Sequence, residues 1–410
     1  MSSKIASTGP LNIHTATPSS VRAVNRSIIL GLIRRRQPIS RAELARLTGI
    51  FRSSVSDIID ELLEEALVKE ERSAPSRRGR VPMSLTLNDS GHRVLGLNIR
   101  PVYCQIASAG LSGIIGRSHT FPTPASPKEL VQAVAKSIRQ LRKERPAGES
   151  EDFQRIGIAI PGHVDVRSGK ILWTPTHSEL SEFPITDQIR EQTGIEALAD
   201  NDCNAGALSE LWLSSGEKKD RSTDFIFLNV SDFGAGAGAV LNGEVYLGHD
   251  AKFAAEIGHM IVDPSGPVCR CQRHGCWELY ISNYATWRRA YPRSPFTLEG
   301  FSELLAQARA GNARALAACK ETARYLSLGI SNIGFAFNPA QVIVAGRITA
   351  IWDIIRTQVE TEHGCSHLTY SIRPARLSAD DSLLHGAVCL ALHHVFVRPS
   401  FGEVSARKSA

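Results

Sequence analysis

The chain has 410 residues, 42% of them hydrophobic, and a formal net charge of +6, which is enough for two or three domains with well-filled cores. It contains no run of about 18 apolar residues and no charged start followed by an apolar segment, which argues against a membrane span and a secretory signal. Five of the eight cysteines are scattered singly, which argues against a disulfide scaffold, so we expect a soluble cytoplasmic protein.

The basic excess is confined to the N-terminal end of the chain. Residues 1–93 contain fifteen Lys and Arg against nine Asp and Glu, and the remainder contains thirty-two of each. A neutral body with a basic N-terminal module is typical of a protein that meets a polyanion, most often nucleic acid.

The N-terminal end predicts a flexible arm followed by three helices. Residues 1–20 are rich in Ser, Thr and Pro and lack an apolar period, which predicts the arm. Apolar residues at helical spacing predict a first helix over residues 21–36. The Ser40-Arg-Ala-Glu43 sequence has the form of a capping box that opens a second helix over residues 42–47, and an amphipathic third helix follows over residues 52–66.

This succession predicts a winged helix-turn-helix domain over residues 21–90. The N-terminal part of the last helix of such a domain enters the major groove. Residues 67–71 are predicted to form a strand, residues 76–82 a basic hairpin tip and residues 83–87 the returning strand, which together make a wing. The alternative is a three-helix protein-interaction module with a solvated basic loop. The candidate contacts to double-stranded operator DNA are Arg41, Arg52, Ser53, Ser56, Arg78 and Arg80.

The remainder of the chain alternates strand-like and helical segments. A turn cluster at residues 88–91 marks the domain boundary. Strand-like runs at residues 94–99, 104–107 and 156–160 and a helical pattern at residues 127–141 predict an α/β fold.

Asn201 and Asp202 follow a strand-like run at residues 196–199 and open a helix of small residues. A carboxylate at the end of a strand and beside a helix N-terminus can accept a hydroxyl proton or a hydrogen bond. The alternative is an Asp that caps the helix and has no ligand role.

Residues 256–278 contain the densest group of potential metal ligands. One residue separates Cys269 from Cys271, and four residues separate Cys271 from Cys276, on a segment bent by glycine and proline. Three such thiols and one more nitrogen or sulfur make a tetrahedral zinc site.

Spacing does not choose the fourth ligand of this site. His259 and His274 both lie in the segment, and either can supply an imidazole nitrogen. The alternatives to a metal site are ordinary buried thiols and a disulfide, and a reducing cytoplasm disfavours the disulfide.

The same segment resembles the ROK family, whose members are repressors, open reading frames and sugar kinases. The resemblance rests on Glu256-Ile-Gly-His259 and on the Cys-x-Cys-x-x-x-x-Cys-x-Glu run that ends at Glu278. The N-terminal module also resembles the winged helix of ROK repressors, through residues 25–26, 40–45 and 55–63. The resemblance implies that residues 93–396 form a two-lobed body of the actin-like ATPase fold, with a tail at residues 397–410.

The resemblance also implies roles for individual residues. In the family the zinc is held by a histidine and three cysteines, which here are His259, Cys269, Cys271 and Cys276, and we interpret this Zn²⁺ as structural because all four positions are filled by the protein. The implied sugar contacts are Asn201, Asp202, Glu256, His259 and Glu278. In ROK kinases the matching aspartate is the general base. Zinc on one imidazole nitrogen leaves the second N–H of the histidine to donate to a sugar.

The segments that bind phosphate in ROK kinases differ in this chain. The first turn, Asp-x-Gly-Gly-Thr in the family, is here Asn98-Ile-Arg-Pro-Val102, which lacks the carboxylate, both glycines and the hydroxyl. The second turn becomes Asp232-Phe-Gly234, and the third survives only as Ala345-Gly-Arg347. Because phosphoryl transfer depends on donors placed around the phosphates, we expect no catalysis.

These features favour a sugar-responsive DNA-binding regulator that represses genes of carbohydrate uptake or catabolism. The alternative is a zinc-containing ROK sugar kinase that phosphorylates a hexose or N-acetylhexosamine, and a regulator controlled by a partner protein is a third reading. One winged helix makes few contacts, so we expect a homodimer, or a tetramer, on a two-fold operator.

Overall fold

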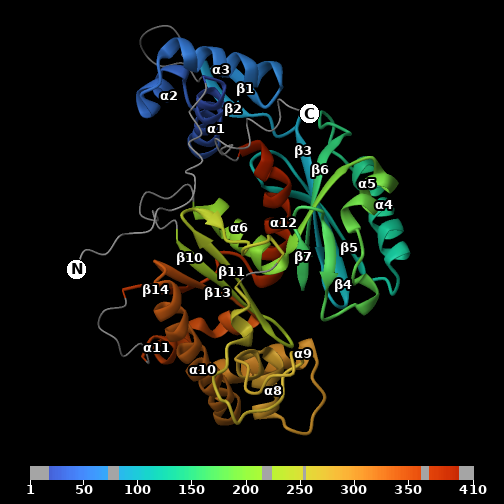
Figure 1. Cartoon of the computed structure of the whole chain (residues 1–410), viewed down its shortest axis with the longest axis vertical. Helices are drawn as coiled ribbons and strands as arrows, with labels where there is room; N and C mark the ends of the chain where they lie inside the picture. The colour runs from blue at the N-terminus through green and yellow to red at the C-terminus, as the bar shows by residue number, and fades with distance from the viewer. Residues whose placement is uncertain (1–17, 73–82, 215–223, 253–254, 362–368, 397–410) are drawn as a thin grey trace, which may run out of the picture. The chain divides into compact units, whose positions relative to one another are not determined.

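The computed structural model describes residues 18–72, 83–214, 224–252, 255–361 and 369–396. The chain divides into two compact units, one of residues 1–88 with 393–410 and one of residues 89–392 (Figure 1). No helix among the described residues is long and apolar enough to cross a membrane.

The N-terminal unit has the expected winged helix-turn-helix fold. Three helices, α1 (Pro18–Arg36), α2 (Arg41–Thr48) and α3 (Arg52–Glu64), are followed by the antiparallel hairpin of β1 (Val68–Arg72) and β2 (Met83–Leu87). The helices and the hairpin share one apolar core, which includes Ile29, Leu30, Ile33, Leu44, Val55, Ile58, Ile59, Leu62 and Leu85. The predicted tip of the wing lies outside the described residues.

Local signals account for most boundaries of this unit and fail at two. The Ser40 hydroxyl accepts a hydrogen bond from the Glu43 N–H at 3.2 Å, as a capping residue does, and Gly49 ends α2 with a φ of 72°. The first helix begins at Pro18, inside the predicted arm, because proline is tolerated in a first turn. The third helix ends at Glu64, two residues early, because Ala66 adopts a φ of 55°.

The first lobe of the second unit is built on a five-stranded sheet of order β5-β4-β3-β6-β9. The first three strands in sequence are antiparallel neighbours, and β6 and β9 add in parallel. Helices α4 (Pro127–Lys143) and α5 (Ile185–Thr193) cover one face with a shared apolar core. The strands are β3 (Arg93–Ile99), β4 (Tyr103–Ala109), β5 (Ile115–Pro122), β6 (Phe153–Ile160) and β9 (Glu196–Asn201), with a small hairpin of β7 (His163–Asp165) and β8 (Lys170–Trp173) beside them.

The second lobe repeats this arrangement in a sheet of order β12-β11-β10-β13-β14. Again an antiparallel hairpin is extended by two parallel strands, and helices cover the outer face with the largest apolar core of the described chain. The strands are β10 (Phe225–Val230), β11 (Ala235–Leu241), β12 (Glu244–Val245), β13 (Gln341–Gly346) and β14 (Ser371–Pro374). The helices are α7 (Glu278–Ile281), α8 (Asn283–Ala290), α9 (Leu298–Arg309), α10 (Ala313–Phe337) and α11 (Trp352–Thr361), with short 3₁₀ turns at Ile257–His259 and Arg347–Ile351.

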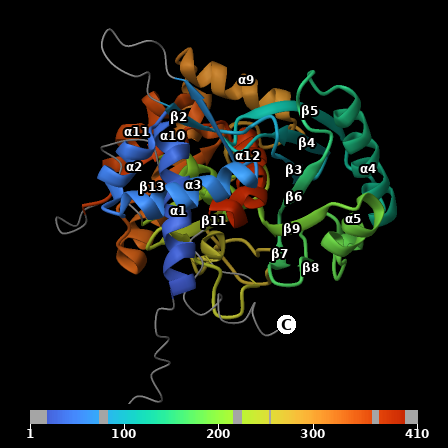
Figure 2. The same ribbon diagram turned by 90° about the horizontal axis from the view of Figure 1, so that it is seen from above.

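Two helices, α6 (Asp202–Ser214) and α12 (Ala379–Phe396), lie on the inner faces of the two sheets. Gly157 in β6 lies so close to the Ala387 carbonyl that a Cβ would overlap it, and Leu383 packs with the strands of the second lobe. Figures 1 and 2 show α12 on the inner side of the first sheet and α4 on its outer side. This duplicated sheet-and-helix architecture is the expected actin-like α/β fold.

Candidate functional site

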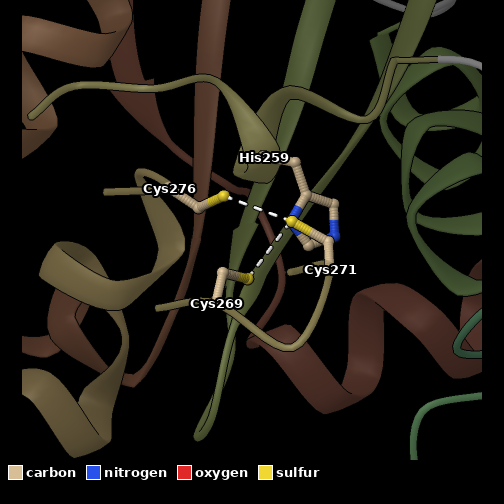
Figure 3. A group of neighbouring side chains, drawn as sticks. All are labelled: His259, Cys269, Cys271 and Cys276. Atoms are coloured by element: carbon tan, nitrogen blue, oxygen red, sulfur yellow. Dashed lines mark hydrogen bonds between the residues drawn. The ribbon is translucent and has the colours of Figure 1, made fainter. Parts of the chain in front are cut away.

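The side chains of His259, Cys269, Cys271 and Cys276 converge in the second lobe (Figure 3). Their candidate ligand atoms all lie within 4.8 Å of one another. The Cys271 and Cys276 sulfurs are 3.4 Å apart, and Cys269 Sγ lies 3.6 Å from His259 Nδ1. Tetrahedral zinc with Zn–S bonds of about 2.3 Å separates its ligands by about 3.8 Å, so this donor set fits zinc.

The structure also distinguishes the two histidines. His259 closes a 3₁₀ turn against the thiols, whereas His274 is exposed and its Nδ1 lies 3.0 Å from the Gly266 carbonyl oxygen. Desolvation acts to raise the pKa of Cys271, but hydrogen bonds from Arg273 contribute to a net lowering to about 6, whereas desolvation raises the pKa values of Cys269 and Cys276. A low thiol pKa favours the thiolate that binds metal.

The ligand segment is anchored to α10 through Trp277, which follows the last cysteine. Its indole is fully buried, packs directly against Gly329 and donates a hydrogen bond to the Tyr325 carbonyl oxygen at 2.7 Å. Because Cys276 and Glu278 are its chain neighbours, the buried indole fixes the position of both.

The two ring nitrogens of His259 lie near different groups. Its Nδ1 is turned to the Cys269 thiol and its Nε2 lies 4.0 Å from Glu256 Oε2. The two nitrogens therefore face different groups, one a thiol and the other a carboxylate. Glu278 lies nearer the thiols than expected. Its Oε1 accepts a hydrogen bond from Cys269 Sγ at 3.0 Å and lies 3.6 Å from His259 Nδ1.

Asn201 and Asp202 lie where β9 passes into α6. The Asn201 side-chain oxygen Oδ1 accepts a hydrogen bond from the backbone N–H of Cys203 at 2.8 Å, and its side-chain Nδ2 donates one to the Gly162 carbonyl oxygen at 2.8 Å. Asp202 is buried, and burial raises the pKa of its carboxyl although the Arg100 charge opposes this. The Asn201 side chain is thus partly occupied by helix capping.

A small cavity of about 10 Å³, enough for roughly one water, is lined by two of the five predicted sugar contacts, whereas Asp202, His259 and Glu278 do not line it. Asn201 and Glu256 both contribute to its lining, together with Gly162, Val166, Asp200, Asn204, Leu247, Ala251 and Lys252. A pyranose requires this space to widen.

Two polar residues beside this cavity were missed from the sequence. His163 Nε2 lies 3.2 Å from Glu256 Oε1, and the position of His163 directly after the Pro161-Gly162 turn was the available signal. Asp200 is fully buried, which raises its pKa to about 6, while hydrogen bonds from Asn204 and the Asn201 N–H oppose the shift.

The turns that correspond to the kinase phosphate segments hold a network of charged side chains. Asp380, in the first turn of α12, accepts from the Tyr103 hydroxyl at 2.8 Å and lies 3.3 Å from Arg100 Nη2. From the second lobe, Arg347 lies 3.9 Å from both Asp380 and Asp232. Carboxylates therefore balance both arginines, and this position offers no uncompensated positive charge to a nucleotide phosphate.

The predicted DNA contacts have different environments. Arg52 and Ser53 are exposed at the start of α3, and Ser56 is half-buried one turn later. Arg41 instead forms a bidentate ion pair with Glu70, both bonds 2.9 Å, and a third contact with Asp60 at 2.8 Å. Its guanidinium ties α2 to α3 and β1, a structural role that the sequence did not indicate. Arg78 and Arg80 lie outside the described residues.

Comparison with known proteins gives matches to both units. The model of the ROK family matches residues 95–394, and that of the MarR family matches residues 23–79. The xylose repressor of Bacillus subtilis is 29% identical over 352 residues, which are 85% of this chain and 88% of the repressor.

Two solved structures share the fold. A ROK family transcriptional regulator, a homologue of the E. coli MLC protein, superposes with a TM-score of 0.77 at 23% identity over 92% of this chain and 97% of its own. A ROK family glucokinase from Streptomyces griseus, solved with glucose and AMPPNP, gives a TM-score of 0.63 at 24% identity over 73% of this chain and 99% of its own. The glucokinase thus matches less of this chain than the regulator does.

Proposed function

Because the chain belongs to the ROK family, we propose that it is a sugar-responsive DNA-binding regulator that represses genes of carbohydrate uptake or catabolism. The observation that supports the proposal is the ion-pair network around Asp380, in which carboxylates pair with the arginines of the altered phosphate turns. In this proposal the body holds a sugar, and the pairing of Arg100 and Arg347 with carboxylates disfavours the phosphate positioning that phosphoryl transfer requires.

The N-terminal unit supplies the second half of the proposal. Its winged helix-turn-helix fold is a DNA-binding architecture, and the Bacillus subtilis relative is named a xylose repressor. Arg52, Ser53 and Ser56 are the proposed contacts to the operator within the described residues, and Arg78 and Arg80 are proposed contacts from the wing. A regulator of transcription acts where the chromosome is, so we propose a cytoplasmic location.

In this proposal His259, Cys269, Cys271 and Cys276 hold a structural Zn²⁺, and Asn201, Asp202, Glu256, His259 and Glu278 bind the sugar. Zinc would fix the segment that carries three of the sugar contacts. A ligand shifts a conformational equilibrium only through contacts that differ between the two states. Since the sugar contacts come from both lobes, a bound sugar favours one lobe arrangement, and a homodimer or tetramer transmits the change to the operator.

The proposal is tested with the full chain and an operator selected from a random duplex library. Pentoses, hexoses, N-acetylhexosamines and their phosphates are screened by thermal shift with and without ATP, and active sugars are then added to an operator-binding assay. We expect one sugar class to change operator affinity without production of ADP. Production of ADP would instead establish the kinase alternative.

Glu256→Ala separates sugar sensing from DNA binding and metal content. The variant should keep both the operator affinity and the metal of the parent but lose the sugar response. Glu299→Ala, an exposed carboxylate on α9, is the matched control. A Glu256→Ala protein that responds normally would place the effector elsewhere.

A further inference from the structure

The most exposed large apolar side chain of the described chain belongs to Phe51, at 83% exposure. It occupies the residue before α3 and makes no side-chain capping bond. This position favours Ser, Thr, Asp or Asn, whose side chains satisfy a free helix N–H. A phenylalanine at this position supplies no capping hydrogen bond and exposes an apolar ring to water. The stability of the fold therefore does not explain why a phenylalanine occupies the position.

Phe51 lies in a basic, concave surface formed by α2, the turn and α3. The concavity measures about 620 Å³, and its lining consists of Ala42, Glu43, Ala45, Arg46, Gly49, Ile50, Phe51 and Arg52. The Arg46 side chain is 70% exposed and Arg52 is also exposed. The surface thus combines an exposed aromatic ring with two arginines, of which Arg46 lies 3.5 Å from Glu43. This combination complements DNA, because arginines position a protein on phosphates while base edges carry the sequence information.

We propose that Phe51 is a specificity-determining residue that reads thymine through contact with its 5-methyl group. The inference rests on the DNA-binding function proposed above. The start of the last helix of this fold enters the major groove, and the thymine methyl is the apolar group that base pairs present there. Insertion of the ring between base pairs is disfavoured, because apolar wedges act from the minor groove.

The test uses the full chain and the operator selected from a random duplex library. Each dT of one half-site is replaced in turn by deoxyuridine, which removes the methyl group alone. Affinity is measured by fluorescence anisotropy at one fixed salt concentration, because the phosphate contribution depends on salt. For the wild type we expect about a fourfold loss at one or two positions, the effect of one buried methyl-sized group.

The same substitutions are measured with Phe51→Ala, and the two series form a double-mutant cycle. Phe51→Ala should bind the thymine operator more weakly and should not distinguish thymine from deoxyuridine at those positions. Phe51→Leu should keep part of the discrimination. The matched control is Phe335→Ala, which removes a ring that is 64% exposed on α10 and should leave the whole profile unchanged.

A Phe51→Ala protein with the wild-type thymine profile overturns the inference. A uniform loss of affinity at every position also overturns it, since that result places the ring against the backbone. Unchanged DNA binding with altered sedimentation would assign Phe51 to an interface between copies of the chain. If the wild type enriches no operator, the proposed function fails together with the inference, whereas the preceding outcomes contradict the inference alone.

Discussion

Substitution of Asp380 by Asn should destabilise the body of the protein by removing one charge between its lobes. Asp380 faces Arg100 and Tyr103 from the first lobe and Arg347 from the second. Asparagine has the same shape and still offers a carbonyl oxygen to the Tyr103 hydroxyl. The variant therefore isolates the electrostatic part of the contact.

The size of the effect follows from burial and geometry. Removal of one partner from a fully buried ion pair costs about 3–5 kcal/mol. The Arg100 side chain is 13% exposed and that of Asp380 29%, and the separations are 3.3 and 3.9 Å. Solvent screening and the remaining charge of Asp202 reduce the loss, so we expect about 2 kcal/mol and a fall of about 5 °C in Tm.

The assay is thermal unfolding of the full chain, followed by calorimetry or circular dichroism. Asp381→Asn is the control, because Asp381 is an exposed neighbour whose carboxylate accepts a hydrogen bond from the capping Ser378 hydroxyl at 2.7 Å. Its Tm should change by less than about 2 °C, as surface substitutions do. Equal shifts in the two variants, or a more stable Asp380→Asn protein, would refute the assigned role of the network.

Three further outcomes are expected. Gly329→Ala places a methyl group in the Trp277 ring, so thermal unfolding should show a loss of about 1–3 kcal/mol; an unchanged Tm would contradict this packing. The folded pKa of Asp200, about 6 against 3.8, means that its stabilising contribution is complete below pH 4 and lost as pH rises through 6. Unfolding experiments across pH should therefore show Asp200→Asn gaining about 2 kcal/mol of stability over the wild type between pH 4 and pH 7, and a constant difference would exclude this carboxyl as the cause. Cys271→Ser should lose bound zinc in metal analysis and His274→Ala should retain it. Loss of zinc from His274→Ala, with zinc retained by His259→Ala, would reassign the fourth ligand.

The winged helix-turn-helix was predictable because its signals are local. A capping hydroxyl, a glycine in the left-handed conformation and an apolar period act on backbone bonds within about four residues. The same locality explains the misplaced ends. Nothing in the sequence marks Ala66 as the residue that leaves the helical conformation. Proline is compatible with the first helical position but does not require a helix to start there, so the start at Pro18 could not be predicted.

The cysteine spacing and the altered phosphate turns could also be recognised in the sequence alone, since each lies within one short segment. Only the tertiary structure decided which residues from distant parts of the chain contact these segments. It brought His259 to the thiols and left His274 exposed, set Asp380 against Arg100 across 280 positions of the chain, and occupied Arg41 with Glu70. Such pairings depend on how helices and sheets pack, and packing is determined by buried surface across the whole fold and not by neighbours along the chain.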